Sequence, residues 1–392
     1  MFVRKFHSST KALSDFSHVI IGGGIIGTSI AAELSKKSTS NNILLIEKEG
    51  SLGTETTSRN SEVIHGGLYY PKDSLKSKFC IEGKELIYNA LKTGTFNPLQ
   101  VGINQCGKLI VAQNDEEIEQ LEKIHQICND VGVETNFVSK ETVKSKYPLL
   151  KAQLALNSPS TGIISVHDYL LYFQTIFENN QGTVVFNTKV KDIDKQNDSY
   201  VINCQDEDGE FEISSDVIIN AGGLHAPKIS NYLLPPDRKY KGYYGKGTYF
   251  AYQPKENPGK MVDTLIYPCP NPNAASLGTH LTFDMGGQIK FGPDLEMLDI
   301  EDPDEIDYTP SERNLIEAHK AVTRYLPHIK LDELVPSYTG VRPKIGHPKD
   351  GFADFIVKEE EGFPGFFNLL GIESPGVTSA WAIAKHVSNL AK

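Results

Sequence analysis

Apolar and polar positions follow an ordered pattern from residue 17 onward. Residues 17–21 form an apolar run, the sequence GGGIIG follows at 22–27, and residues 28–37 carry apolar side chains at helical spacing. A second apolar run at 42–46 ends in Glu47. A strand, a glycine-rich turn, a helix and a strand in this order predict a βαβ unit that binds a dinucleotide.

Each special residue of this unit suits one part of a dinucleotide. Gly22 permits a tight turn, Gly24 lets backbone N–H groups reach a pyrophosphate, and Gly27 allows the helix to pack closely against the strand. Glu47 lies twenty residues beyond Gly27, where a carboxylate accepts hydrogen bonds from ribose hydroxyls. FAD and NAD share these groups, so the unit alone does not choose between them.

Three other segments favour a flavin. The sequence SRNSEVIHGGLYYP at 58–71 places a histidine and a glycine pair where backbone and an imidazole can approach a redox ring. An apolar strand at 216–221 runs into a second glycine pair, and a strand at 365–370 precedes a helix that extends to about residue 390. Ser374 is the expected N-cap of that helix and Pro375 its first residue, so its positive end would face the cofactor. The sequence therefore predicts FAD.

Strand-like runs broken by proline and glycine occupy residues 101–112 and 246–294. Their close spacing predicts an antiparallel sheet. The expected fold class is α/β (α+β overall), with a discontinuous Rossmann-like FAD-binding domain and an inserted antiparallel-sheet substrate domain. We expect the FAD-binding domain at 15–100, 150–235 and 338–392, and the substrate domain at 101–149 and 236–337. The acidic stretch at 296–307 is expected to be a solvent-exposed loop.

The first fourteen residues differ from the rest of the chain. Arg4, Lys5 and Lys11 are positive, hydroxyl side chains stand between them, and no acid precedes Asp15. This composition is typical of a mitochondrial transit peptide over residues 1–14, although a plain basic extension has the same features. We therefore expect a mitochondrial protein.

Composition limits the partners of the folded part. The 392 residues carry a formal net charge of −11, which gives no general attraction to nucleic acid. No apolar run approaches the roughly 18 residues of a membrane span, so we expect no transmembrane segment and at most peripheral membrane contact. The five cysteines are widely spaced without a CxxC pair, so we expect reduced thiols and no metal. The oligomeric state stays open.

Short motifs occur in one consistent order from residue 17 to near the C-terminus. They are the nucleotide turn, NS at 60–61, VIH at 63–65, LYY at 68–70, CGKL at 106–109, IYP at 266–268, LGTH at 277–280, GP at 292–293, GVR at 340–342 and SPG at 374–376. In this order they resemble the L-2-hydroxyglutarate dehydrogenase family, within the FAD-dependent D-amino-acid-oxidase-like superfamily. Arg59, Glu62 and the pair Pro343-Lys344 depart from the residues usual in that family.

The resemblance implies an FAD-dependent 2-hydroxy acid dehydrogenase. Its expected reaction is the oxidation of L-2-hydroxyglutarate to 2-oxoglutarate by hydride transfer to flavin N5. The electrons then pass to a carrier other than NAD, such as a quinone or an electron-transfer protein. The sequence itself gives no indication of which carrier is used.

Two histidines are the candidate catalytic residues. Oxidation of a 2-hydroxy acid requires removal of the hydroxyl proton, so a base must face the flavin. His280, on a predicted strand of the substrate domain, is the leading candidate for this base. His65, in the glycine-rich loop, is expected to orient the substrate or to tune the flavin. For each histidine a purely structural role is the alternative.

A dicarboxylate needs cations at both ends. The planar fork of Arg342 is expected to hold the C1 carboxylate, and an ion pair between the lobes is the alternative. Lys246, Arg59 and Lys344 are candidates for the distal carboxylate, and the sequence does not choose among them. Tyr267 is a further candidate substrate contact.

The predicted FAD contacts comprise the segments described above and their neighbours. They are Gly22, Gly24, Ile26, Gly27, Glu47, Lys48, Ser58, Arg59, Asn60, Ser61, Val190, Ala221, Gly222, Gly371, Pro375, Gly376 and Val377.

Other functions stay open on the sequence alone. Ser58-Arg59 and the sequence IHGG at 64–67 also resemble FAD-dependent glycerol-3-phosphate dehydrogenases. The remaining alternatives are an amino-acid oxidase-like enzyme, an oxidase that passes electrons to oxygen, and a non-catalytic mitochondrial assembly factor that retains FAD.

Overall fold

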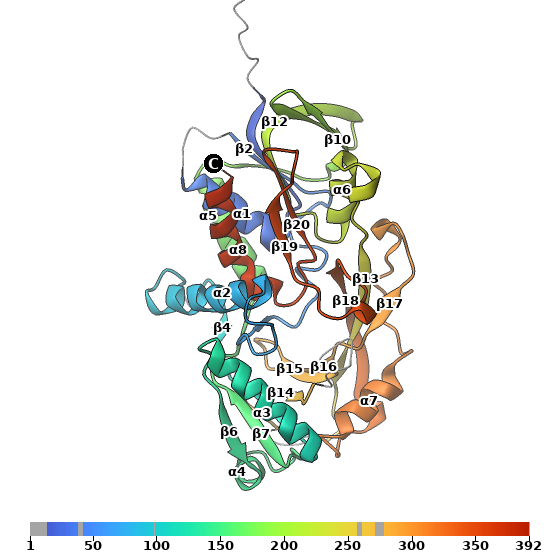
Figure 1. Ribbon diagram of the computed structural model, residues 1–392. Helices are drawn as coiled ribbons and strands as arrows, with labels where there is room; N and C mark the ends of the chain where they lie inside the picture. The colour runs from blue at the N-terminus through green and yellow to red at the C-terminus, as the bar shows by residue number, and fades with distance from the viewer. Residues whose placement is uncertain (1–13, 38–41, 98, 257–260, 271–277, 392) are drawn as a thin grey trace, which may run out of the picture.

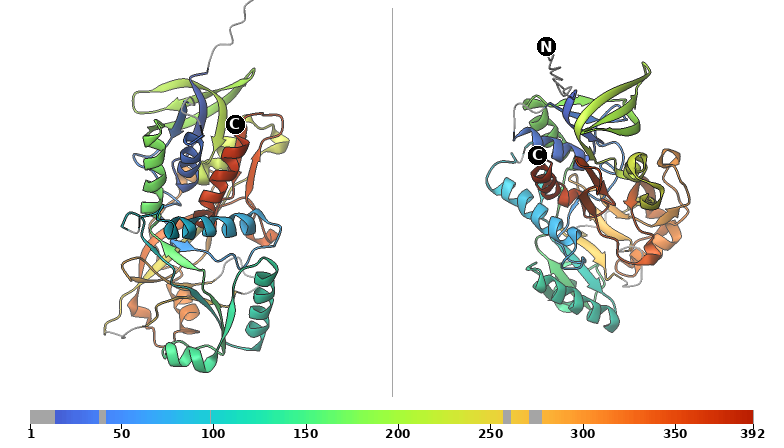
Figure 2. Two further views of the ribbon diagram at one scale, coloured as in Figure 1. Left: turned by 90° about the vertical axis from the view of Figure 1, so that its left-hand side faces the viewer. Right: turned by 45° about the horizontal axis from the view of Figure 1, so that its top comes forward.

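The chain forms two lobes that lie one above the other, with helix α2 (Leu75–Lys92) running between them (Figure 1, Figure 2). The computed structural model describes residues 14–37, 42–97, 99–256, 261–270 and 278–391. The expected transit peptide lies outside these residues, except for Ser14. Within the described ranges, none of the helices combines the length and the apolar character that a membrane crossing requires.

A mostly parallel sheet forms the upper lobe. At its centre β1 (Phe16–Ile21) pairs in parallel with β2 (Ile43–Ile46) and with β12 (Glu210–Asn220). The other strands are β9 (Thr183–Val185) and β20 (Phe366–Leu370), which continue the parallel part, and β10 (Lys189–Gln196), β11 (Ser199–Gln205) and β19 (Ile356–Glu359), which pair antiparallel.

Helices cover both faces of this sheet. α1 (Ile25–Ser35), α5 (Val166–Asn179) and α8 (Gly376–Leu390) pack together on one face, and α6 (Ala226–Leu233) lies on the other (Figure 1). Burial on two faces explains why β2 and β20 are apolar along almost their whole length. The predicted βαβ unit is confirmed, although its helix begins at Ile25, three residues earlier than the pattern indicated.

The lower lobe is built on a largely antiparallel sheet. Only the pairing of β5 (Lys108–Ala112) with β14 (Leu265–Pro268) is parallel among the described strands of this sheet. The other strands are β6 (Asn136–Ser139), β7 (Leu154–Ser158), β13 (Tyr243–Tyr252), β15 (His280–Phe283), β16 (Ile289–Gly292), β17 (Glu296–Leu298) and β18 (Leu334–Lys344). α3 (Asp115–Asp130), α4 (Lys140–Lys146) and α7 (Leu315–Thr323) flank it. The predicted fold class is thereby confirmed.

A small sheet connects the lobes. β3 (Val63–Ile64), β8 (Gly162–Ile164) and β4 (Ile103–Asn104) pair antiparallel. Val63 belongs to the apolar core of the lower lobe, whereas Ile64 belongs to that of the upper lobe. The segment that carries His65 is therefore held between two cores.

Two of the expected domain boundaries fall inside the lower sheet. β7 follows the boundary at 150 and β18 crosses the boundary at 338, yet both pair with strands of the lower lobe. We therefore propose that the substrate domain includes residues 154–158 and 334–344.

Candidate active site

A cavity of about 420 Å³ lies between the lobes. The glycine turn, the segment 56–65, the end of β18 and the N-terminus of α8 line it. A second cavity, of about 110 Å³, shares Gly24, Thr56, Thr57, Ala221 and Gly223 with the first. Because the two are contiguous, they can take one elongated ligand.

The smaller cavity fits the nucleotide end of FAD. Glu47 is buried there, and its Oε2 accepts a hydrogen bond from the Gly23 backbone N–H at 2.7 Å. Burial raises the pKa of this carboxyl above its ordinary value. Gly22 has a φ of +105°, and a Cβ on Gly27 would lie 2.0 Å from the Gly22 carbonyl oxygen, so both positions require glycine. The turn and the acid are arranged as a dinucleotide site requires.

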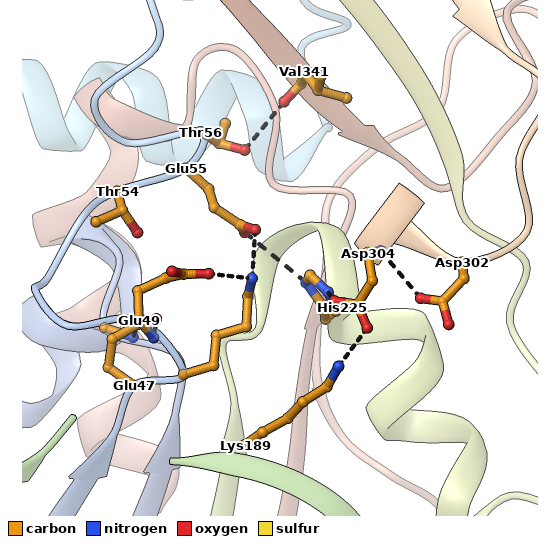
Figure 3. Close-up of polar contacts among 12 residues, drawn as sticks. Glu47, Glu49, Thr54, Glu55, Thr56, Lys189, His225, Asp302, Asp304 and Val341 are labelled. Atoms are coloured by element: carbon orange, nitrogen blue, oxygen red, sulfur yellow. Dashed lines mark hydrogen bonds and ion pairs between the residues drawn. The ribbon is translucent and has the colours of Figure 1, made fainter. Parts of the chain in front are cut away.

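Ion pairs surround this nucleotide end (Figure 3). Lys48 lies between Glu49 and Glu55, at 2.7 and 2.9 Å. Burial alone would lower the pKa of Lys48, but its two carboxylate partners outweigh burial and raise it. Asp304 forms an ion pair with Lys189 and accepts a hydrogen bond from His225 Nε2 at 2.9 Å. Both of these partners belong to the upper lobe.

The acidic stretch at 296–307 therefore connects the lower lobe with the upper lobe through ion pairs. Asp302 pairs with Lys228 of α6 at 2.6 Å, next to the contacts of Asp304 with the upper lobe. Burial alone would raise the pKa of Asp304, but hydrogen bonds from Lys189 and His225 hold it well below its ordinary value. Much of the acidic stretch is exposed, as the sequence predicts. However, residues 296–298 form β17, and Asp302 and Asp304 form ion pairs with basic residues that are far away in the sequence.

Asp304→Asn should weaken FAD binding by about two- to tenfold, as expected for the loss of partly exposed ion pairs. The substitution keeps the side-chain shape but removes the charge that faces Lys189 and His225. The measurement is the dissociation constant of FAD by flavin fluorescence, at low and high KCl. Asp299→Asn is the matched control, since no described ion pair engages Asp299. Equal constants for both variants would contradict the role of Asp304.

Most of the predicted FAD contacts line the two cavities. Gly22, Gly24, Glu47, Lys48, Val190, Ala221 and Gly222 line the smaller one. Ile26, Arg59, Asn60, Ser61, Pro375, Gly376 and Val377 line the larger one, together with Gly24 and Ala221.

Three predicted FAD contacts are not among the lining residues. Gly27 packs against the Gly22 carbonyl, and the Ser58 hydroxyl donates to the Thr54 carbonyl at 3.0 Å. Gly371 has a φ of +68°, and a Cβ there would lie 2.9 Å from the side chain of Ile345. These residues shape the walls and do not face the cavities.

His280 lies in the wall of the larger cavity with an exposed fraction of 6%. Its Nδ1 is 3.0 Å from the Gly278 carbonyl oxygen, which can only accept, so Nδ1 carries the proton. Nε2 then keeps a free lone pair. The ring stacks on Tyr267, with 3.9 Å between the centroids. Burial lowers the pKa of His280 to about 3, and Arg342 and Lys108 act in the same direction. The imidazole is therefore a neutral base at physiological pH.

His65 lies in the same cavity. Its backbone N–H donates to the Thr378 hydroxyl at 3.0 Å, and its Nε2 is 3.1 Å from the Ser374 hydroxyl. Burial, with smaller effects from Lys108 and His280, lowers its pKa to about 3. The prediction that Ser374 caps α8 is wrong: Pro375 occupies the N-cap position, and Ser374 instead contacts His65.

Arg342, at the cavity end of β18, faces the larger cavity. Among the described residues, no hydrogen bond or ion pair engages its guanidinium. A Cβ on Gly247 of the neighbouring β13 would lie 3.4 Å from Arg342 Nη1, so glycine leaves room for the fork. The alternative of an ion pair between the lobes has no support in the described part of the chain.

A second cationic group completes this wall. Lys76, in the first turn of α2, and Lys344, at the end of β18, both pair with Glu373, at 3.0 and 2.8 Å. All three line the larger cavity. Burial alone would raise the pKa of Glu373, but the two lysines outweigh it and hold that pKa below its ordinary value. The carboxylate is thus ionised and keeps both ammonium groups at the wall.

The other candidates for the distal carboxylate are placed differently. The Lys246 amino group donates to the Asp307 carbonyl at 2.7 Å, and Lys246 is not among the residues that line either cavity. Arg59 lines the larger cavity, with its guanidinium over the Tyr308 ring and its Nε bonded to the Thr54 carbonyl. Glu62 accepts a hydrogen bond from the backbone N–H of Val166, at the start of α5. The backbone φ of Glu62 is +56°, in the left-handed region that favours glycine.

Lys76 and Glu373 are not among the site residues that the sequence predicts. No motif surrounds Lys76, and its contact with Glu373 joins residues 297 positions apart. Glu373 directly precedes the SPG motif at 374–376, and this position was the only feature of the sequence that pointed to Glu373 as a site residue. Over the described ranges, no group of three His, Cys, Asp or Glu side chains is placed to hold a metal ion.

Comparisons with known proteins show the family of the chain. A family model described as FAD dependent oxidoreductase matches residues 17–390. The chain is 33% identical to the mitochondrial L-2-hydroxyglutarate dehydrogenase of Arabidopsis thaliana, over 95% of this chain and 82% of that protein. It is 30% identical to a glycerol 3-phosphate dehydrogenase of Caloramator mitchellensis, over 96% of this chain and 74% of that protein.

The fold has solved counterparts. The L-α-glycerophosphate oxidase of Mycoplasma pneumoniae with FAD bound superposes with a TM-score of 0.84 at 23% identity, over 96% of this chain and 94% of that chain. The family model confirms the predicted cofactor, FAD. The chain belongs to the FAD-dependent oxidoreductase family, as a relative of the L-2-hydroxyglutarate dehydrogenases.

Proposed function

We propose that this FAD-dependent oxidoreductase converts L-2-hydroxyglutarate to 2-oxoglutarate. The observation that carries the proposal is the charge of the larger cavity beside the free nitrogen of His280. Four cationic side chains line that cavity: Arg59, Lys76, Arg342 and Lys344. One carboxylate, that of Glu373, lines it as well. Such a wall favours a substrate with two negative charges.

The same charges disfavour an amino acid. The ammonium group of an amino acid would need a carboxylate, and Glu373 is already held by Lys76 and Lys344. A second substrate class does fit: a phosphate monoester is also a dianion, and the relative from Caloramator mitchellensis is named a glycerol 3-phosphate dehydrogenase. Glycerol 3-phosphate is therefore the second candidate.

The chain's own residues supply binding and proton removal. Arg342 holds the C1 carboxylate with two parallel hydrogen bonds, and Lys344 and Lys76 attract the distal carboxylate. His280 Nε2 accepts the proton of the C2 hydroxyl, because its Nδ1–H is already committed to Gly278. FAD, when bound, supplies the hydride acceptor at N5. The substrate loses one proton and one hydride and leaves as the 2-oxo acid.

Two further assignments accompany this proposal. The electrons leave for an acceptor other than NAD, a quinone or an electron-transfer protein. A mitochondrial location is supported by the basic N-terminal residues and by the name of the Arabidopsis thaliana relative.

Anaerobic mixing of the FAD-loaded protein with single substrates tests the proposal. L-2-hydroxyglutarate should bleach the flavin, whereas the D enantiomer should not, because Arg342 and His280 fix which face of C2 carries the hydrogen. L-2-hydroxybutyrate, which lacks the distal carboxylate, should bind at least about tenfold more weakly, as for the loss of one charge-assisted hydrogen bond. Flavin absorbance is the readout.

Each other result selects an alternative. Bleaching by glycerol 3-phosphate and not by the hydroxy acids favours the second candidate. Bleaching by amino acids contradicts the charge argument. A flavin that no substrate reduces favours the non-catalytic assembly factor, and peroxide release during aerobic turnover identifies an oxidase.

A further inference from the structure

A buried lysine lies behind Tyr69 and Tyr267, two of the residues that line the larger cavity. Lys108, the first residue of β5, has an exposed fraction of 0%. Among the described residues its amino group has no hydrogen-bond partner, and no carboxylate pairs with it. An ammonium removed from water without a counter-charge is costly, so such a group calls for a functional reason.

Aromatic rings separate this lysine from the cavity. The Lys108 Nζ lies 4.8 Å from the centroid of the Tyr69 ring and 4.6 Å from that of Tyr267. Both tyrosines line the larger cavity, and Tyr267 stacks on His280. Cation–π contacts compensate part of the lost hydration. The positive charge therefore sits one side chain away from the substrate.

Neutral groups complete the surroundings of Lys108. His65 and His280 are close enough for its charge to lower their pKa values. Cys80 of α2 and Cys128 of α3 are the other titratable groups that act on it, and burial raises the pKa of both thiols, so both are uncharged at neutral pH. Nothing among the described residues balances the ammonium until an anion enters the cavity.

We propose that Lys108 is the buried counter-charge of the anionic substrate. It is a positioning residue, since it acts through space and through Tyr267 without touching the substrate. The inference rests on the proposed function only in that the substrate is an anion. Lys108 attracts the anion through space from behind the aromatic rings, whereas Arg342, Lys76 and Lys344 line the cavity and can contact the anion directly.

A pH dependence follows from the burial of Lys108. Burial lowers its pKa to about 8, while the Cys80 and Cys128 thiols have small opposing effects. The lysine is charged below this pKa and neutral above it. Affinity for an anion should therefore be high at neutral pH and decline as the pH rises through about 8.

Glutarate is a suitable probe, because it has both carboxylates but no hydroxyl to oxidise. Its dissociation constant is measured by isothermal titration calorimetry on the FAD-loaded protein, from about pH 6 to about pH 10. The unmodified protein should lose affinity toward alkaline pH. Lys108→Met should bind glutarate about 10- to 100-fold more weakly at neutral pH, as expected for the loss of one buried charge that lies one side chain away from the anion. Lys108→Arg stays charged, so it should bind without the alkaline decline.

Lys84→Met is the matched control. Lys84 is another buried lysine, but it donates to the Gly66 carbonyl and the Ser160 hydroxyl and has no described effect on either histidine. This variant should keep the alkaline decline. In Lys108→Met the pKa values of His65 and His280 should also rise, which a two-dimensional NMR titration of the imidazoles detects and which a merely structural role would not produce.

The inference about Lys108 and the proposed function fail on different results. A glutarate affinity that does not change with pH in the unmodified protein, or an alkaline decline that persists in Lys108→Arg, overturns the inference. If Lys108→Met does not fold, these two profiles still decide. If L-2-hydroxyglutarate fails to reduce the flavin while glutarate binding depends on Lys108, the proposed function fails and this inference stands. If reduction occurs but binding ignores Lys108, this inference alone fails.

Discussion

His280→Gln is expected to slow anaerobic flavin reduction by about 10²- to 10⁴-fold. Glutamine keeps much of the volume and can still donate to the Gly278 carbonyl, but it has no lone pair basic enough to take the hydroxyl proton. Substrate affinity should change little, because the proposed contacts of the carboxylates are Arg342, Lys344 and Lys76. The measurement is stopped-flow absorbance of the flavin under saturating substrate.

The acid side of the pH profile gives an independent check of this base. Because burial lowers the pKa of His280 to about 3, the unprotonated form persists from neutral pH down to the approach of that value. The reduction rate should therefore show no acid decline near pH 6.5, the ordinary range of a histidine. His328→Ala, which alters a histidine outside the described lining of both cavities, is the control. Parental reduction rates in His280→Gln would remove His280 from the reaction.

Arg342→Lys should lower kcat/KM by about 10- to 100-fold, mainly through a higher KM. A lysine keeps the charge but loses one of two charge-assisted hydrogen bonds, each of which contributes about 1.5 to 3 kcal/mol. Steady-state kinetics with L-2-hydroxyglutarate measures the effect, and the reduction rate at saturation separates binding from chemistry.

Arg313→Lys serves as the control for Arg342→Lys. Arg313 is exposed and pairs with Glu296 at the surface, where exchange of arginine for lysine costs little. Parental kinetics are expected for this variant. If Arg342→Lys also kept its parental KM and kcat, Arg342 would have no part in carboxylate binding.

The cofactor half of the protein was largely predictable from the sequence. The order of apolar run, glycine turn, helix and acid imposes one local geometry, because helix and strand can cross so closely only at glycine. The structure accordingly places Gly22, Gly24 and Glu47 at one cavity. Local chemistry was less predictable at Ser374, where an apparent helix cap instead contacts His65.

The positions of the candidate substrate-binding residues depend on the register between β13 and β18. Lys246 pairs with Val341, whereas Gly245 pairs with Arg342 and Gly247 with Gly340. Since successive side chains of a strand point to opposite faces, this register directs Arg342 into the cavity and Lys246 toward Asp307. A one-residue shift would exchange the two faces, and the sequence of neither strand reveals which register forms.

By itself, the sequence determined the nucleotide-binding unit and the flavin, because these follow from short segments whose geometry is local. It left two histidines, His65 and His280, as candidates for the base. Only the tertiary structure decided which charges meet. Lys76 and Glu373, Lys189 and Asp304, and Lys108 behind Tyr267 are each brought together by the packing of distant elements. Long-range pairing of this kind is governed by sheet register and lobe packing, which no local pattern encodes.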